Sequence, residues 1–212
     1  MLPPINCLQA FELQQERQAR IVDLRTPSEF GHGHPRDAIS ISYSPKGLSE
    51  RLELVLPFGT ALVFLIPTDL KIQEIENQLE FDSFSILGML AGGFPAWCDN
   101  GLPTGLTSEI PIQQLGVFTH DEGNIIIDVR EPMEWATGHI PGALLISLGN
   151  LERCIGDLPQ HGGIAVVCEA GIRSSTAASI LQSNHFLQVS NVTGGTGSYR
   201  RSRLPLQYPQ ET

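Results

Sequence analysis

The sequence predicts an α/β protein made of two tandem domains, each with a parallel sheet flanked by helices. Two observations carry this prediction. Short apolar runs of strand length alternate with segments whose apolar residues recur at helical spacing, a pattern typical of parallel sheets covered by helices. The same order of segments also occurs twice, because residues 21–30 align with residues 126–135 at an offset of 105 (126 − 21). A period near one hundred residues indicates a duplicated domain.

Each half is expected to run through the same elements. A helix leads to a short strand ending in Asp-x-Arg, then come a helix around Pro-x-Glu, a histidine-containing turn, a second short strand and a connecting helix. A buried strand, a helix and a final strand before a Gly-Gly pair complete the half. The connecting helices are expected at 47–56 and 148–158, and the buried strands at 61–65 and 164–167. The Gly- and Pro-rich stretch 100–105 separates the halves, so we place the domains at 1–103 and 104–212.

Composition narrows the possible partners and cofactors. Thirteen Lys and Arg against twenty-three Asp and Glu give a formal charge of −10, which argues against nucleic acid or a membrane as partner. No apolar run has membrane-spanning length, and the start lacks the pattern of an export signal, so we expect a cytoplasmic protein. The four cysteines show no CxxC spacing and no accompanying histidine cluster. This predicts no metal site and no disulfide framework, and we expect no cofactor.

Residues 168–174, Cys-Glu-Ala-Gly-Ile-Arg-Ser, carry the predicted chemistry. Cys168 follows a buried strand and precedes an Ala-rich helix, so its thiolate is expected beneath a helix N-terminus, where free N–H groups and the helix dipole stabilise it. Arg173 adds positive charge, Gly171 permits a positive φ, and Ser174 can cap the helix. The alternative is a buried cysteine acting as a small hydrophobic residue. The Gly, Arg and Ser that follow favour a nucleophile.

These motifs resemble those of the rhodanese family over nearly the whole chain, as two tandem domains. Residues 128–135, followed by 138–143, are similar to the family's first signature. Residues 168–173 are similar to its six-residue active-site loop, and residues 92–97 to its closing Gly-Gly element. The resemblance implies five-stranded parallel α/β domains that transfer sulfur.

In the chemistry that this resemblance implies, a cysteine takes a sulfane sulfur from thiosulfate or a low-molecular-weight persulfide, becomes a persulfide itself, and passes the sulfur to cyanide or a thiol. Carried over by position, Cys168 would be the nucleophile. The residues that would bind the substrate, mainly through their backbone amides, are Glu169, Ala170, Gly171, Ile172, Arg173 and Ser174.

The first domain departs from this pattern. An offset of 103 places Leu65 at the position of Cys168, and residues 66–70 contain neither Cys nor Arg. Pro67 also removes one N–H from any anion cradle. We therefore expect an inactive first domain, an arrangement similar to that of two-domain thiosulfate sulfurtransferases. It is also similar to the pair that follows a metallo-β-lactamase-type persulfide dioxygenase domain, although no HxHxDH motif is present here.

Asp128 and Arg130 lie at the carboxyl end of a strand, where open α/β sheets place their sites, and they could orient the active loop. Asp23 and Arg25 repeat them in the inactive domain, so we favour a structural ion pair. His34 and His139 match each other in the same way and are interpreted as scaffold residues.

Charges near the loop bear on the choice of sulfur donor. Glu169 is expected to disfavour doubly charged donors such as thiosulfate. Arg200, Arg201 and Arg203 form a basic cluster, which either attracts an anionic donor or is a solvated helix face.

Two alternatives to a sulfurtransferase stay open. One is a persulfide carrier or regulatory module that serves a protein partner. The other is a phosphatase or arsenate reductase of similar fold. Those enzymes use one more residue between Cys and Arg, whereas the Cys-x4-Arg spacing here resembles the sulfur-transferring branch.

Overall fold

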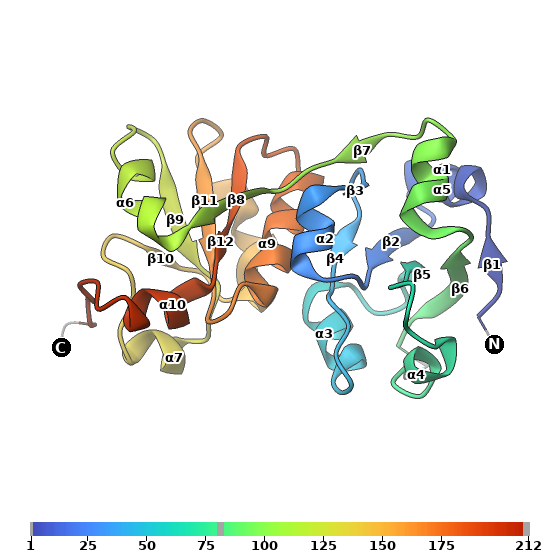
Figure 1. The fold of residues 1–212 in the computed structure, drawn as a ribbon, viewed down its shortest axis with the longest axis horizontal. Coiled ribbons are helices and arrows are strands. Elements are labelled where there is room, and N and C mark those ends of the chain that lie inside the picture. The colour runs from blue at the N-terminus through green and yellow to red at the C-terminus, as the bar shows by residue number, and fades with distance from the viewer. Residues whose placement is uncertain (1, 80–82, 210–212) are drawn as a thin grey trace. The chain divides into compact units, whose positions relative to one another are not determined.

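The computed structural model describes residues 2–79 and 83–209, and the chain divides into two units, Met1–Leu106 and Thr107–Thr212 (Figure 1). Each unit contains a five-stranded sheet in which all neighbouring strands are parallel, with helices in the connections. The predicted α/β class is thereby confirmed. The sequence places the domain boundary after residue 103, and the structure divides the units after residue 106.

Unit 1 has the strand order β1-β6-β5-β2-β4, with β3 and β7 paired as a separate antiparallel ribbon. Its strands are β1 (Pro4–Ile5), β2 (Arg20–Asp23), β3 (His34–Pro35), β4 (Ile39–Ser40), β5 (Ala61–Leu65), β6 (Ser85–Leu90) and β7 (Thr104–Gly105). Its helices are α1 (Cys7–Gln15), α2 (Pro27–His32), α3 (Leu48–Val55), α4 (Ile72–Glu76) and α5 (Gly93–Asp99). The edge strand β1 is two residues long and contains a proline, which limits pairing with other chains.

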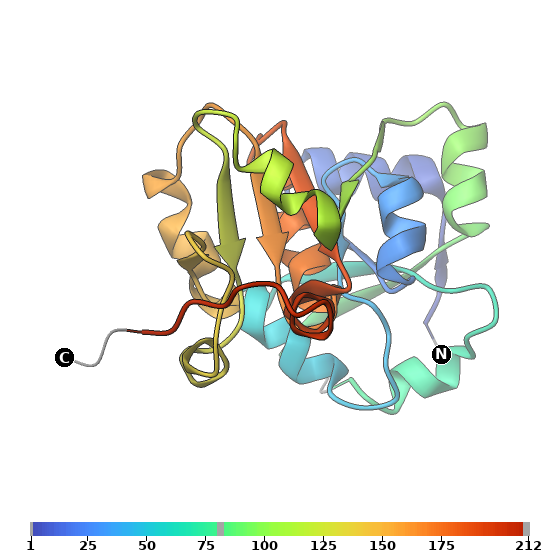
Figure 2. The ribbon, with the colours of Figure 1, turned by 60° about the vertical axis from the view of Figure 1, so that its left-hand side comes forward.

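Unit 2 has the strand order β10-β9-β11-β12-β8, which is the order of unit 1 read from its other edge (Figures 1 and 2). Its strands are β8 (Ser108–Pro111), β9 (Ile125–Asp128), β10 (Leu144–Leu145), β11 (Ile164–Val167) and β12 (Val189–Thr193). Its α-helices are α6 (Leu115–Phe118), α7 (Pro132–Ala136), α8 (Leu151–Cys154), α9 (Ile172–Ser183) and α10 (Gly195–Arg201). Short 3₁₀ turns η1 (Ile112–Gln114), η2 (Leu148–Asn150) and η3 (Ile155–Asp157) extend α6 and α8.

The central strands form because their side chains are buried on both faces of the sheet. All four residues of β11, Ile-Ala-Val-Val, are buried, and so are four of the five residues of β5. β-Branched and aliphatic residues suit this setting. Trp97 fills the core of unit 1 and donates its indole N–H to the carbonyl of Pro103 at 2.9 Å. At the matching position of unit 2, Tyr199 packs in the core.

The two histidines expected to be scaffold residues occupy the same place in both units. The His34 ring stacks on Phe30 at 3.8 Å between centroids, and the His139 ring stacks on Trp135 at 3.5 Å. Each Nδ1 faces the backbone carbonyl of its aromatic partner. Burial lowers the pKa of His34 to about 4, so this ring is neutral at physiological pH.

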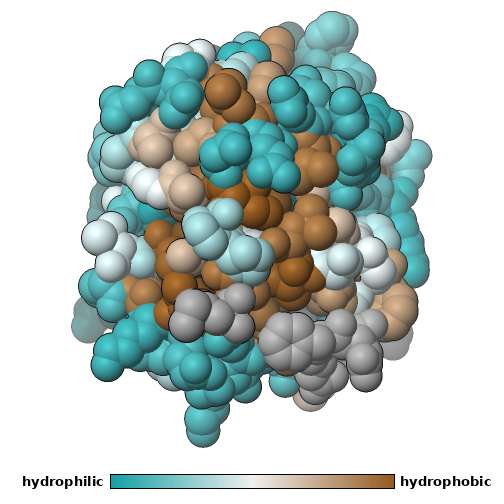
Figure 3. All heavy atoms as spheres, turned by 90° about the vertical axis from the view of Figure 1, so that its right-hand side faces the viewer, coloured by the Kyte–Doolittle hydropathy of each residue, from teal (hydrophilic) through white to brown (hydrophobic). Residues whose placement is uncertain are grey.

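Hydrophobic side chains gather on the face of unit 1 near β1 and β6, within a hydrophilic surround (Figure 3). Among the described residues, no helix combines the length and apolar character needed to cross a bilayer.

The C-terminal segment of unit 2 lies against its core. Leu204 and Leu206 pack against the hydrophobic cluster. Gln207 pairs with His139 through two backbone hydrogen bonds of 2.9 Å each. This pairing fixes the turn that contains His139.

We expect Leu206→Ala to destabilise unit 2 by about 1–2 kcal/mol, less than the loss for a fully buried leucine because Leu206 is partly exposed. Urea denaturation followed by circular dichroism measures the change. Leu187→Ala is the matched control, since Leu187 is 93% exposed in the same unit. Equal stability of the two variants would contradict docking of the tail.

Candidate active site

Cys168 is the first residue after β11 and is buried. Val167 pairs with Asp128 of β9, so the cysteine lies at the carboxyl edge of the sheet. The chain turns back at Gly171, which has φ +97° and is the N-cap of α9. The Gly171 N–H donates to Cys168 Sγ at 3.1 Å. The sulfur therefore lies at the start of α9 and accepts a hydrogen bond from a loop amide.

Ser174 does not cap the helix, and that prediction is wrong. The cap position requires a left-handed residue for the chain to fold back, and Gly171 meets this need at low cost. Helix α9 therefore begins two residues earlier than Ser174. The Ser174 hydroxyl instead lies 3.3 Å from Cys168 Sγ and donates to Asn191 Oδ1 on β12 at 2.7 Å. Ser174 is thus in contact with the candidate nucleophile.

Helix α10 anchors the first half of the loop. The carbonyl of Cys168 accepts from Thr196 N at 2.8 Å, and that of Glu169 accepts from Gly197 N at 3.0 Å. Gly195 has φ +56°, and a Cβ there would lie 2.2 Å from the Cys168 carbonyl oxygen. The close approach of the two segments therefore requires glycine.

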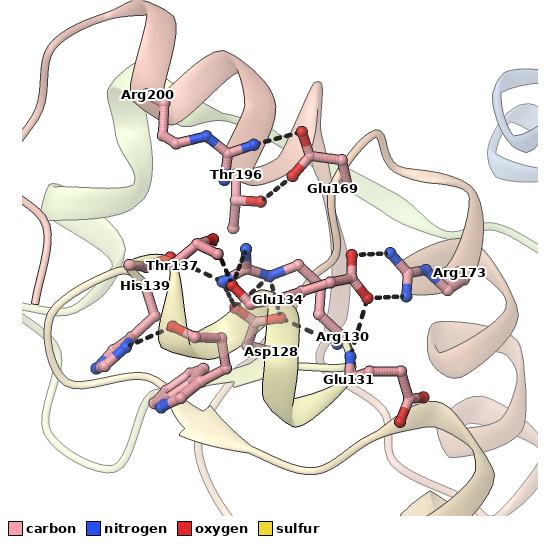
Figure 4. A network of polar contacts seen from close by, with 12 residues as sticks. Asp128, Arg130, Glu131, Glu134, Thr137, His139, Glu169, Arg173, Thr196 and Arg200 are labelled. Carbon is pink, nitrogen blue, oxygen red and sulfur yellow. Dashed lines mark hydrogen bonds and ion pairs between the residues drawn. The ribbon is translucent and has the colours of Figure 1, made fainter. Parts of the chain in front are cut away.

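Glu169 is paired within this anchor. Its carboxylate accepts from Arg200 and, at 2.9 Å, from the Thr196 hydroxyl (Figure 4). Burial alone would raise the pKa of Glu169, but the bonds from Arg200 and Thr196 outweigh it and lower the pKa below its ordinary value. Of the basic cluster, Arg200 on α10 therefore pairs with the loop. Arg201 bonds Ser198 at the surface.

Arg173 is also paired. Its guanidinium makes two hydrogen bonds, of 2.6 and 2.7 Å, to the carboxylate of Glu134 on α7 (Figure 4). The bond from Arg173 lowers the pKa of Glu134 to about 2, and the same bond raises the pKa of Arg173. The sequence predicts that Arg173 adds positive charge near Cys168, and the two groups interact electrostatically. The structure shows in addition an ion pair that ties α7 to the loop.

Asp128 and Arg130 form an ion pair, as expected from their recurrence as Asp23 and Arg25. Arg130 Nη2 lies 2.7 Å from Asp128 Oδ2, and both side chains are buried. The same guanidinium donates to the backbone carbonyls of Gly138 and Glu134. In unit 1, Arg25 binds Asp23 and the carbonyl of Gly33 in the same manner. The recurrence indicates that the pair fixes the scaffold.

Two of the predicted substrate-binding residues face solvent. Ala170 is exposed, and Ile172 is 47% exposed. Their side chains do not join the polar contacts around Cys168, so any part they have in binding comes from their backbone amides.

The structure corrects the alignment of unit 1 with unit 2 by one residue. Leu65 pairs with Asp23, as Val167 pairs with Asp128, and the Asp residues are equivalent. Ile66, rather than Leu65, therefore occupies the position of Cys168. The register could not be fixed from two apolar runs of different length, where either alignment pairs aliphatic residues.

Sequence reasoning missed three partners of the loop: Glu134, Asn191 and Thr196. Glu134 was visible as part of Pro-x-Glu, but Glu29 at the matching position belongs to the capping box of α2 and, among the described residues, makes no hydrogen bond to an arginine. Asn191 gave a weak signal, because β12 has a polar residue at the position where β6 of unit 1 has Met89. Among the described residues, no three His, Cys, Asp or Glu side chains gather closely enough to hold a metal ion.

Comparison with known proteins indicates the family to which the chain belongs. A family model of the rhodanese-like domain matches residues 115–202. The chain is 32% identical over 103 residues to the thiosulfate sulfurtransferase GlpE of Pseudomonas putida, which aligns 49% of this chain with 89% of that protein. It is 28% identical over 106 residues to a sulfurtransferase of Allochromatium vinosum, covering 50% of this chain and 99% of that protein. The chain belongs to the rhodanese family.

A third relative is the putative sulfur carrier protein YrkF of Bacillus subtilis, 37% identical over 92 residues. The match covers 42% of this chain and 50% of that relative, so the chain spans half of its length. Together these relatives support sulfur transfer, with a sulfur donor and an acceptor, as the general chemistry of the chain.

We expect the Glu134–Arg173 pair to make stability depend on pH. Because the pKa of Glu134 is depressed in the folded state to about 2, its contribution is fully present above the ordinary glutamate value and is lost as pH falls toward 2. Thermal melts of wild type and Glu134→Gln should therefore differ most near neutral pH and converge near pH 2. Glu29→Gln, which removes a carboxylate with no arginine partner, should give a smaller difference. A constant gap across the pH range would count against the ion pair.

Proposed function

We propose that the chain is a sulfurtransferase in which Cys168 carries the sulfur as a persulfide. The observation that supports this most directly is the Gly171 amide aimed at Sγ at the start of α9. An N–H donor and a helix N-terminus stabilise negative charge on sulfur. The amides of residues 169–173 would then surround the terminal sulfur of the persulfide.

The reaction balances without an external oxidant or reductant. The thiolate of Cys168 attacks the sulfane sulfur of the donor, and the donor's S–S bond breaks. The leaving thiolate or sulfite departs with the bonding electron pair. A thiol, as its thiolate, or cyanide then attacks the terminal sulfur of the Cys168 persulfide, and Sγ leaves with its electron pair. The enzyme thiolate is regenerated.

We further propose that the donor is a low-molecular-weight persulfide rather than thiosulfate. Glu169 and Arg200 pair with each other beside the loop, and Arg173 pairs with Glu134. A doubly charged donor gains little from cations that already have partners, and the carboxylate of Glu169 repels it.

Replacing the nucleophile tests the sulfur-carrying step. Wild type incubated with glutathione persulfide should gain the mass of one sulfur atom in intact-mass spectrometry and lose it when cyanide or thiol is added. Cys168→Ser should show no gain, whereas Cys98→Ser, which changes an exposed cysteine, should load normally. Loading of Cys168→Ser to the wild-type level would overturn the assignment.

Glu169→Gln tests the choice of donor. Freeing Arg200 from its partner should raise kcat/KM for thiosulfate about tenfold relative to glutathione persulfide, the scale of one charge interaction near a protein surface. The double variant Glu169→Gln with Arg200→Gln is the matched control and should return the ratio toward wild type. An unchanged ratio in the single variant would mean that the pair does not set donor choice.

A sulfur carrier serving a protein partner is the second candidate, because the name of YrkF describes that role for a relative. Multiple turnover with free donor and acceptor separates the two functions. A carrier would load once and turn over slowly until its partner is added, whereas an enzyme would keep transferring sulfur.

A further inference from the structure

Asn191 closes a ring of hydrogen bonds around the sulfur of Cys168. Its Oδ1 accepts from the Ser174 hydroxyl at 2.7 Å, and its Nδ2 donates to the carbonyl of Gly171 at 3.2 Å. Ser174 Oγ lies 3.3 Å from Cys168 Sγ, and the Gly171 amide donates to the same sulfur. All four residues are buried. Asn191 therefore touches both groups that contact the sulfur without touching the sulfur itself.

The orientation of the Asn191 amide follows from its partners. The Gly171 carbonyl is an acceptor, so the Asn191 atom facing it must be the NH₂ group. Oδ1 then faces Ser174, and because Oδ1 has no proton the hydroxyl must donate to it. A hydroxyl has a single proton. While Ser174 donates to Asn191, it offers only lone pairs to Cys168, which suits a thiol that donates its S–H.

We propose that Asn191 is a positioning residue that competes with the Cys168 thiolate for the hydroxyl proton of Ser174. When Cys168 releases its proton to solvent, the hydroxyl turns to donate to the anionic sulfur, and Oδ1 of Asn191 loses its donor. Leaving a buried acceptor without a partner is costly. Asn191 thereby favours the states in which Sγ carries no charge.

The competition has a consequence for turnover, and this step rests on the proposed persulfide function. In the persulfide the negative charge lies on the terminal sulfur, and Sγ is bonded on both sides. Ser174 then returns to Asn191. The thiolate is the one state in which Asn191 lacks its donor, so its attack on the donor sulfur restores that bond. Asn191 makes the thiolate more nucleophilic and favours the loaded form.

Bonds from their partners lower the pKa of Glu134 and of Glu169, and the bond to Glu134 raises the pKa of Arg173, so these three groups are shifted away from the range that tests this proposal. Three ion pairs lie on the elements about the loop: Arg173 with Glu134, Arg200 with Glu169, and Arg130 with Asp128. Two further charged residues are Glu131, which acts electrostatically on Arg173, and Arg201, which bonds Ser198. Burial raises the pKa of Tyr199 on α10. Wild type and the variants at Asn191 and Ser174 share all of these groups, so a difference between their pH profiles reports on the thiol of Cys168.

The experiment measures the rate at which iodoacetamide alkylates Cys168 between about pH 5 and 10, followed by mass spectrometry of the peptide that contains it. Asn191→Leu removes both polar atoms at similar size. The pH of half-maximal rate should fall by about one unit, the scale of one hydrogen bond to a charged group. In the Ser174→Ala background, Asn191→Leu should move the pH of half-maximal rate by less than about 0.3 unit, because the hydroxyl that couples Asn191 to Cys168 is gone. Ser179→Ala, a buried serine of α9 bonded to Thr176, is the control and should leave it unchanged.

Alkylation does not require sulfur transfer, so this result stands apart from the proposed function. Loss of loading in the mass assay with the expected pH shifts would contradict the function and leave the role of Asn191 intact. An equal shift with and without the Ser174 hydroxyl, or no shift in Asn191→Leu, would overturn the proposal. If Asn191→Leu does not fold, Asn191→Val, whose β-branched side chain suits a strand, makes the same comparison.

Discussion

The carboxylate of Asp128 is fully buried at the end of β9, and a buried charge must be paired. Arg130 pairs with it and also binds the carbonyls of Glu134 and Gly138, so one guanidinium fixes the strand end, helix α7 and the turn after it. Helix α7 in turn presents the Glu134 carboxylate to Arg173. The position of the cysteine loop therefore depends on an ion pair that does not touch the sulfur.

Unit 1 shows that this ion pair can be present without the cysteine loop. Asp23 and Arg25 form the same pair and hold the carbonyl of Gly33. At the end of β5, however, Ile66 and Pro67 replace the cysteine and the next residue of the loop. Glu29 then caps α2 and has no loop arginine to bind. The ion pair is common to both units, whereas the cysteine loop is a local feature of unit 2.

The fold could be predicted because its signals are local or repeated. Apolar runs define the strands, and the copied Asp-x-Arg motif defines the duplication. The site could be predicted only where its residues are contiguous, as in the loop from Cys168 onward. Glu134 is 39 residues from Arg173, and Asn191 is 17 residues from Ser174, so these contacts exist only once the sheet has formed. The capping role given to Ser174 failed because Gly171, directly before the first residue of α9, met the backbone requirement first.

Because the charged side chains near the loop are paired, neutral hydrogen-bonding groups make the direct contacts with the Cys168 sulfur. Arg173 pairs with Glu134 and Arg200 pairs with Glu169, so the groups in direct contact with the sulfur are the Gly171 amide and the Ser174 hydroxyl. Neutral donors act over a short range, unlike a free cation, whose field extends toward solvent. Such a site distinguishes the charge states of one sulfur atom more sharply than it attracts anions from a distance. This property suits the proposed alternation of Cys168 between thiolate and persulfide.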